Sequence, residues 1–351
     1  CANRAELHPY MSGKWEENGA KTVGSWENVF GEGIYTDEIF MAWHYASYVE
    51  RMARSAREIY DVPLFVNAAM NSRGRRPGEY PSAGPLAHLI DVWHCAAPSV
   101  DFIAPDLYDD GFKGWTAQYH LHNNPLFIPE IRHTQNNGVR AFYVFGEHNA
   151  LGFSPFAIED GSDEQGTPFV EGYEKLREIM PLVTGWQGKD AMWGLLFDQN
   201  DKERIIEDGS LVLTCRHNFT LPWDPRATDG SVWPEGGGII IRIAENEYIV
   251  AGNGIVVEFA TASEKAFGKA AESLGEDGFA SAESKGTGTP GRKAWKGTRC
   301  GIGSVDEVKV NADGSFSYIR HLNGDQDHQG RHVRISVGDY KTLYVRLYEY
   351  Q

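Results

Sequence analysis

The carboxylate with the clearest chemical setting in this sequence is Glu130. It ends the apolar stretch Pro125-Leu-Phe-Ile-Pro-Glu130, and Arg132 and His133 follow closely. A carboxylate at the end of a buried strand can attack the anomeric carbon of a sugar, provided that a protonated carboxyl group lies about 5–5.5 Å away. Glu130 can equally pair with one of the two neighbouring bases and have only a structural role.

Four further residues are candidates for contacts with a sugar. Tyr108 can donate a hydrogen bond to Glu130 and keep that carboxylate ionised, or it can be an aromatic residue at the rim. Asn67 can bind sugar hydroxyls or make a loop turn, as Asn often does. Glu147 and His148 can line the same pocket or belong to an ion pair. Each candidate therefore has a substrate-binding interpretation and a structural one.

We expect no metal or organic cofactor. His120 and His122 lie two positions apart on a predicted helix and point in different directions, so they do not form a metal site with His133. The four cysteines are far apart and form no CxxC pair, which gives no support to a zinc site; they are Cys1, Cys95, Cys215 and Cys300. The sequence leaves open whether Cys215 and Cys300 form a disulfide.

The elements that must position the candidates alternate between helix and strand over residues 1–200. Helices are predicted at 39–54, with Asp37 as N-cap and Phe40, Trp43 and Ala46 at helical spacing, and at 86–95, 115–122 and 169–180. Four nearly uncharged runs predict buried strands, at 63–67, 100–105, 125–129 and 140–145. This alternation is typical of β/α units around a parallel sheet. In a β/α barrel the carboxyl ends of the strands carry the active site, and the candidates lie there.

Residues 201–351 have a different pattern, with short alternating strands separated by Gly, Asn and Asp turns. We predict a β-sandwich or jelly-roll domain for this part. The chain therefore divides into two predicted domains, 1–200 and 201–351.

Composition restricts the class of partner. A formal net charge of -16 argues against nucleic acid and against anionic membrane surfaces, because both require a basic face. The aromatic share of 12% suits sugar stacking, and it equally suits a large core.

Several stretches, in one order along the chain, resemble the bacterial β-galactosidase-like enzymes of glycoside hydrolase family 35. They include Phe40-Met-Ala-Trp-His-Tyr-Ala, Phe102-Ile-Ala-Pro-Asp-Leu-Tyr, Asn124-Pro-Leu-Phe-Ile-Pro-Glu130 and Ala150-Leu-Gly-Phe-Ser-Pro-Phe. The resemblance implies a TIM-type β/α barrel that removes terminal β-galactosyl or related residues with retention. Glu130 is then the nucleophile at the end of the seventh strand, and the acid/base Glu follows the fourth strand in an Asn-Glu pair.

The sequence departs from that pattern. If Glu130 ends the seventh strand, the four apolar runs correspond to strands five to eight, and no runs for strands one to four precede them. Its one Asn-Glu pair, Asn246-Glu247, lies in the predicted β-domain. We therefore expect an N-terminal half-barrel chain or segment to supply the acid/base Glu, and a homo-oligomer is also compatible. The alternative is a catalytically incomplete fragment whose β-domain has a carbohydrate-binding or assembly role. We expect a periplasmic or secreted location rather than a cytoplasmic one.

Overall fold

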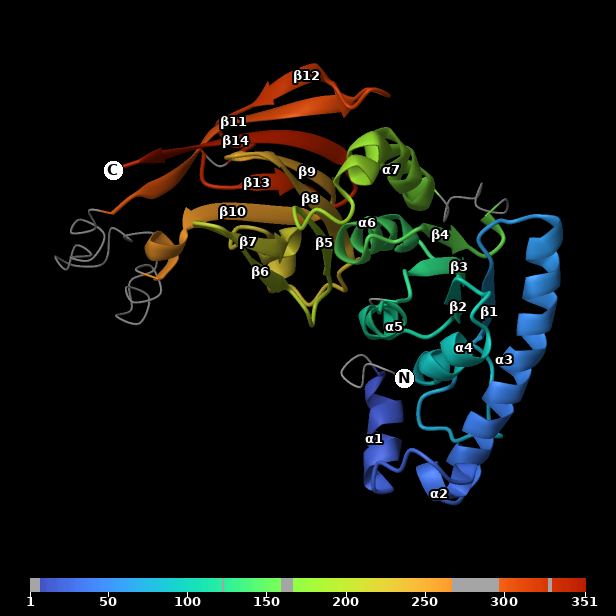
Figure 1. Ribbon diagram of the computed structural model, residues 1–351. Coiled ribbons are helices and arrows are strands. Elements are labelled where there is room, and N and C mark those ends of the chain that lie inside the picture. The colour runs from blue at the N-terminus through green and yellow to red at the C-terminus, as the bar shows by residue number, and fades with distance from the viewer. Residues whose placement is uncertain (1–6, 122, 159–166, 267–296, 328–329) are drawn as a thin grey trace. The chain divides into compact units, whose positions relative to one another are not determined.

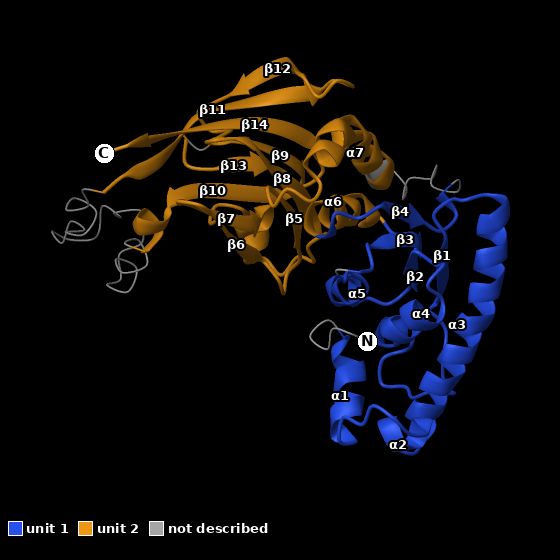
Figure 2. Ribbon diagram, in the orientation of Figure 1, with its two compact units in different colours: residues 1–134, 148–162 blue, residues 135–147, 163–351 orange. Residues whose placement is uncertain are grey.

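The computed structural model describes residues 7–121, 123–158, 167–266, 297–327 and 330–351 (Figure 1). Cys1 and His122 lie outside these ranges. The chain forms two compact units: unit 1 comprises residues 1–134 and 148–162, and unit 2 comprises residues 135–147 and 163–351 (Figure 2). In this division residues 163–200 group with the second unit, whereas the sequence places the boundary between the two predicted domains at residue 200. The described chain is mixed α/β, with one parallel sheet and two antiparallel sheets.

Unit 1 is built on a four-stranded parallel sheet in the order β1-β2-β3-β4. The strands are β1 (Phe65–Ala69), β2 (Phe102–Leu107), β3 (Phe127–Ile131) and β4 (Gly152–Pro155). The first three confirm the predicted strands, each beginning two residues later than expected. The described residues contain no closed barrel.

The fourth predicted strand, 140–145, is wrong, because this segment lies in helix α6 (Asn137–His148). Every residue from Ala141 to Gly146 is buried. A helix that is buried on all sides shows no 3.6-residue periodicity, and a short apolar run within it cannot be distinguished from a buried strand. The next strand along the chain is β4.

The helices of unit 1 are α1 (Pro9–Glu17), α2 (Trp26–Phe30), α3 (Ile34–Ile59), α4 (Ile90–Ala96) and α5 (Phe112–Tyr119), with the 3₁₀ turn η2 (Ala87–Leu89). The predicted helix 39–54 lies inside α3, which starts earlier. Its N-cap is Gly33, and Asp37 is in its first turn. Asp37 is therefore not the N-cap.

Helix α3 buries its small apolar side chains and exposes its large ones. Ala42, Ala46 and Ala53 are buried, together with Ile39. The exposed apolar side chains are Ile34, Tyr35, Phe40, Met41, Trp43, Tyr45, Tyr48, Met52 and Ile59. Among the described strands β1 is an edge strand that pairs with β2, and Phe65 remains 41% exposed.

The loop between α5 and β3 is held by Asn124, whose side chain is fully buried. Its amide oxygen accepts from Ile103 N at 2.9 Å and contacts His94 Nε2 at 3.1 Å. Its amide nitrogen donates to Ile103 O at 3.0 Å and to Tyr119 O at 2.7 Å. One side chain therefore fixes the chain just before β3 against β2.

Unit 2 contains two antiparallel sheets, one of four strands in the order β13-β10-β7-β6 and one of six in the order β12-β11-β14-β9-β8-β5. The strands are β5 (Met192–Phe197), β6 (Glu203–Asp208), β7 (Leu211–His217), β8 (Gly236–Ala244), β9 (Glu247–Asn253), β10 (Ile255–Thr261), β11 (Arg299–Val310), β12 (Phe316–Leu322), β13 (Val333–Ile335) and β14 (Lys341–Tyr350). Buried side chains from both sheets form one apolar cluster. The antiparallel strands predicted after residue 201 are thus confirmed.

Helix α6, apart from its last residue His148, and helix α7 (Thr167–Trp186) belong to unit 2, as do the 3₁₀ turns η4 (Asn218–Thr220) and η5 (Pro225–Ala227). A Cβ on Gly194 of β5 would lie 2.2 Å from Tyr143 O of α6, so the helix packs directly on the strand backbone. Cys215 and Cys300 are buried free thiols, which answers the question of their pairing.

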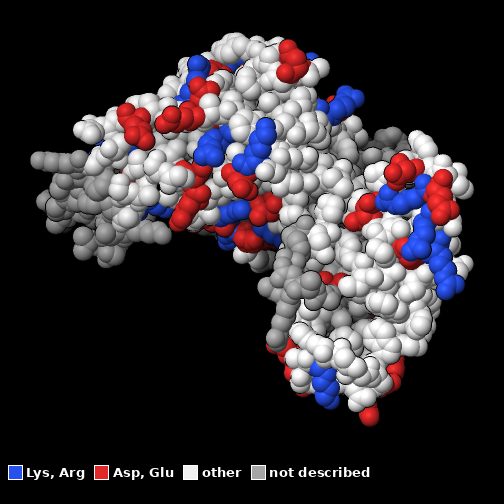
Figure 3. Space-filling model, in the orientation of Figure 1, with Lys and Arg blue, Asp and Glu red and all other residues white. Residues whose placement is uncertain are grey.

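The surface and helices add two observations. Acidic and basic side chains are interspersed on the face in view in Figure 3. Within the described ranges, no helix is both long and apolar enough to cross a membrane.

Candidate active site

The carboxyl ends of β1, β2 and β3 bring Asn67, Asp106, Tyr108 and Glu130 together. Asp106 lies opposite Glu130 in the pairing of β2 with β3, and opposite Ala69 in the pairing of β1 with β2. Each of the two acidic residues directly follows a proline, Pro105 or Pro129. Proline fixes its own φ and favours an extended residue before it, so the backbone leading to both carboxyl groups is restricted.

Among the described residues, the hydrogen-bond partner of the Glu130 side chain is Tyr108. Its hydroxyl donates to Glu130 Oε1 at 2.5 Å. Partial burial, together with this bond to a carboxylate, raises the pKa of Tyr108 to about 12. The phenol therefore stays protonated at neutral pH and remains a donor, which is one of the two roles considered for Tyr108 from the sequence.

Asn67 contacts the second carboxyl group and not Glu130. Its Nδ2 donates to Asp106 Oδ1 at 2.6 Å. Burial raises the pKa of Asp106; the hydrogen bond from Asn67 opposes this, and the nearby charge of Glu130 adds to it. Asn67 thus orients the acidic neighbour of the predicted nucleophile.

Arg132 does not pair with Glu130, although the sequence allowed it. Its Nη2 donates to Tyr108 O at 2.5 Å, and its Nη1 lies 3.5 Å from Asp110 Oδ1. Among the described residues, no Lys, Arg or His forms an ion pair with Glu130. Arg132 therefore binds the backbone carbonyl of Tyr108, and the Tyr108 hydroxyl contacts the carboxylate of Glu130.

Glu147 and His148 occupy the end of α6 and not a strand end. Glu147 forms an ion pair with Arg204, which also donates to Gly194 O at 2.6 Å. Glu147 thus has the structural role, an ion pair, that was considered for it from the sequence. The contacts of Arg204 with Glu147 and Gly194 link α6 to β5 and β6. His148 is buried, with Nε2 3.1 Å from Thr116 Oγ1 and Nδ1 2.9 Å from His120 Nδ1. Both side chains are engaged in packing contacts within their own units.

Sequence inspection did not assign a role to Asp106. The signal was present in Ala104-Pro-Asp-Leu-Tyr108, because Pro-Asp at the end of one strand matches Pro-Glu at the end of the next. Only the register shows that the two carboxyl groups are direct neighbours.

The group of side chains can support nucleophilic attack. It contains one carboxylate held by a phenol and a second carboxyl whose pKa is raised, at the ends of parallel strands where active sites form. In the described parts of the chain, no group of three or more His, Cys, Asp or Glu residues could hold a metal ion.

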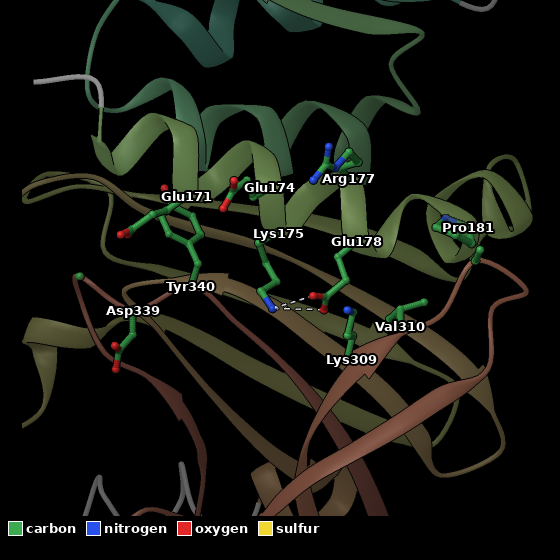
Figure 4. A pocket seen from close by; sticks show the side chains of 12 residues that line it. Glu171, Glu174, Lys175, Arg177, Glu178, Pro181, Lys309, Val310, Asp339 and Tyr340 are labelled. Carbon is green, nitrogen blue, oxygen red and sulfur yellow. Dashed lines mark hydrogen bonds and ion pairs between the residues drawn. The ribbon is translucent and has the colours of Figure 1, made fainter. Parts of the chain in front are cut away.

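Unit 2 has a separate cavity of about 770 Å³ between α7 and the residues around Lys309 and Tyr340 (Figure 4). Its lining carries charges of both signs, and Lys175 pairs with Glu178 across 3.1 Å. None of the predicted site residues lines it.

Comparison with known proteins gives one partial match. A family model described as a domain of unknown function (DUF5597) matches residues 169–334. This segment runs from α7 to β13 and does not include Glu130. No curated protein matches the chain.

Proposed function

We propose that this chain contributes the nucleophile of a retaining glycosidase that removes terminal β-galactosyl or related residues from oligo- or polysaccharides. Glu130 attacks the anomeric carbon and forms a glycosyl ester, while the leaving oxygen takes a proton from an acid. Water then attacks the ester at the same carbon, the acid residue accepts its proton, and Glu130 is released. The sequence resemblance to glycoside hydrolase family 35 supports the choice of sugar.

The observation that carries the proposal is the contact between Tyr108 and Glu130. The carboxylate of Glu130 accepts a short hydrogen bond from a phenol and has no cationic partner among the described residues, which leaves a carboxylate oxygen for attack. A structural glutamate at a strand end would instead be expected to pair with the nearby Arg132. Arg132 is engaged with Tyr108 O and Asp110.

We further propose that the parallel sheet is half of a β/α barrel and that a second β/α half completes it. Parallel sheets are normally covered on both faces, and β1 is the edge strand of the described sheet, with Phe65 on the sheet face and partly exposed. Helix α3 adds a surface whose exposed side chains include Tyr45 and Tyr48. A partner that adds a strand to β1 and packs apolar side chains on α3 satisfies both features, and it would bring the acid/base Glu.

The two antiparallel sheets of unit 2 support a β-sandwich. Their buried side chains form one cluster, as expected for two sheets packed face to face. In this proposal the β-sandwich accompanies the barrel, as the resemblance implies.

The test is covalent trapping with 2-deoxy-2-fluoro-β-galactosyl fluoride. Fluoride is an activated leaving group, so the attack by Glu130 does not require the acid supplied by the partner. We expect the mass of the chain to rise by one fluorogalactosyl group, located by peptide mapping on Glu130 and absent from Glu130→Gln. A label on another residue, or equal labelling of the variant, contradicts the assignment.

A further inference from the structure

Strand β14 carries a row of polar aromatic side chains on one face. Leu343 and Val345 are fully buried in the core between the two antiparallel sheets. Because side chains alternate along a strand, the residues between and beyond them face the other way. This β14 row consists of Tyr344, Arg346, Tyr348 and Tyr350. Figure 1 shows the C-terminal part of β14 extending away from α7, and Tyr348 and Tyr350 are 49% and 42% exposed.

Tyr348 lies flat on the sheet because its neighbour across the strand pair is glycine. Gly301 of β11 is the register partner of Tyr348. A Cβ on Gly301 would lie 2.5 Å from Tyr348 Cζ, and one on Gly303 would lie 3.4 Å from its Cδ1. The ring therefore covers the backbone of β11 with one face, and its other face is left for solvent or a ligand.

The rings continue along the strand. Tyr350 lies 5.5 Å from Tyr348 between ring centroids, with 33° between the planes. At the other end, the Arg346 guanidinium lies 5.4 Å from the centroid of the Tyr344 ring. The row thus offers a succession of flat surfaces and not isolated aromatic side chains.

The polar and charged groups beside the row are paired with one another. Asp306 accepts from Arg346 Nη2 at 2.8 Å and contacts His321 Nδ1 at 2.8 Å. The Tyr344 hydroxyl donates to Glu247. A charged partner would have to break these pairs, whereas an uncharged ligand rich in hydroxyl groups can add hydrogen bonds to them. The paired charges and hydroxyl groups beside the row therefore favour an uncharged ligand that carries many hydroxyl groups.

We propose that the β14 row is a carbohydrate-binding strip for a neutral β-linked glycan chain. Successive pyranose rings stack on Tyr348 and Tyr350, and Arg346 and Asp306 contact the hydroxyl groups of the chain. The apolar face of a sugar ring and a flat aromatic ring bury each other from water, which favours stacking. The strip lies in unit 2 and acts without Glu130, so it holds a polymer independently of the proposed catalytic site.

The experiment is affinity electrophoresis of the full chain in gels that contain soluble β-1,4-galactan, with gels lacking polymer as the reference. Tyr348→Ala removes the central ring. Gly301→Val leaves the tyrosine in place but occupies the space beneath its ring. The matched control is Tyr318→Ala, which removes an exposed tyrosine of β12 whose register partner on β11 is Val308, seven residues along that strand from Gly301.

We expect Tyr348→Ala and Gly301→Val each to weaken retention about three- to tenfold. Tyr318→Ala and Glu130→Gln should be retained like the unmodified chain, and retention of Glu130→Gln separates this proposal from that for the catalytic site. Circular dichroism verifies that each variant is folded. The proposal is overturned if the unmodified chain is not retained, or if Tyr348→Ala is retained equally. It is also overturned if sedimentation shows that Tyr348 mediates association between copies of the chain.

Discussion

The hydroxyl of Tyr108 lies 2.5 Å from Oε1 of Glu130, across the ends of two adjacent parallel strands. In the proposed reaction this bond holds the carboxylate in the orientation for attack. Tyr108→Phe should lower kcat/KM for an aryl β-galactoside about 10- to 100-fold, the value of a hydrogen bond to a charged group. Since the pKa of Tyr108 is raised to about 12, its ionisation does not limit the wild type at moderately alkaline pH. The alkaline limb of the pH profile should therefore be unchanged in the variant.

Asp106 should make stability depend on pH in a definite direction. Its pKa is raised in the folded protein, mainly by burial, so the folded state binds more protons than the unfolded state between the two pKa values. Stability therefore falls as pH rises through this interval.

Asp106→Asn should match the wild type at about pH 4 and be more stable at about pH 7.5. We expect a gain below about 1 kcal/mol, because solvent screens this carboxyl group. Urea unfolding at the two pH values measures it, and Asp110→Asn, whose side chain is 90% exposed, is the control. A variant that is less stable at the higher pH refutes the argument.

Leaving-group dependence tests whether the acid is supplied by a partner. The chain alone should cleave dinitrophenyl β-galactoside, whose leaving group needs no proton, far better than methyl β-galactoside. When the second half of the barrel is added to the chain, the ratio of the two cleavage rates should fall by about 10²–10⁴-fold, because a general acid contributes about this factor. Steady-state rates on the two substrates measure the ratio. If the chain alone already cleaves both substrates comparably, it contains its own acid, and Asp106 becomes the first candidate.

Asn124 should be a large contributor to the stability of unit 1. Asn124→Ala leaves the buried N–H and C=O of Ile103 and the C=O of Tyr119 without their present partners. We expect a loss of about 2–4 kcal/mol in the free energy of unfolding. Chemical denaturation measures this loss, and Asn311→Ala, in an exposed turn, should cost much less.

The exposed face of α3 should behave as an interface. Tyr45→Lys combined with Tyr48→Lys should reduce self-association of the isolated chain, while the melting temperature stays close to that of the wild type. Ala46→Lys places a charge on the buried face of the same helix and should destabilise strongly. Sedimentation velocity and thermal melts distinguish the two faces. A strong loss of stability in the double variant would show that its face is already packed.

The sequence predicted those parts of unit 1 whose patterns are local. Three strands followed from their uncharged apolar runs, and Tyr108 was paired with Glu130 because both follow such runs. The segment 140–145 was misassigned because burial on all sides removes the periodicity that identifies a helix. The role of Asn67 toward Asp106 depends on the register of β1 with β2, which a single sequence does not encode in a visible pattern. The exposure of Phe40 and Trp43 likewise depends on what packs against α3.

The contact between Tyr348 and Gly301 constrains how this surface can change over evolutionary time. While the tyrosine ring lies on β11, position 301 has no room for a side chain, although its backbone conformation is open to other residues. Once the tyrosine is replaced by a small residue, that restriction ends. Related sequences should therefore show covariation between these positions, with glycine at 301 wherever an aromatic residue stands at 348. In lineages where positions 301 and 348 vary independently, an aromatic ring on this part of the sheet is no longer required.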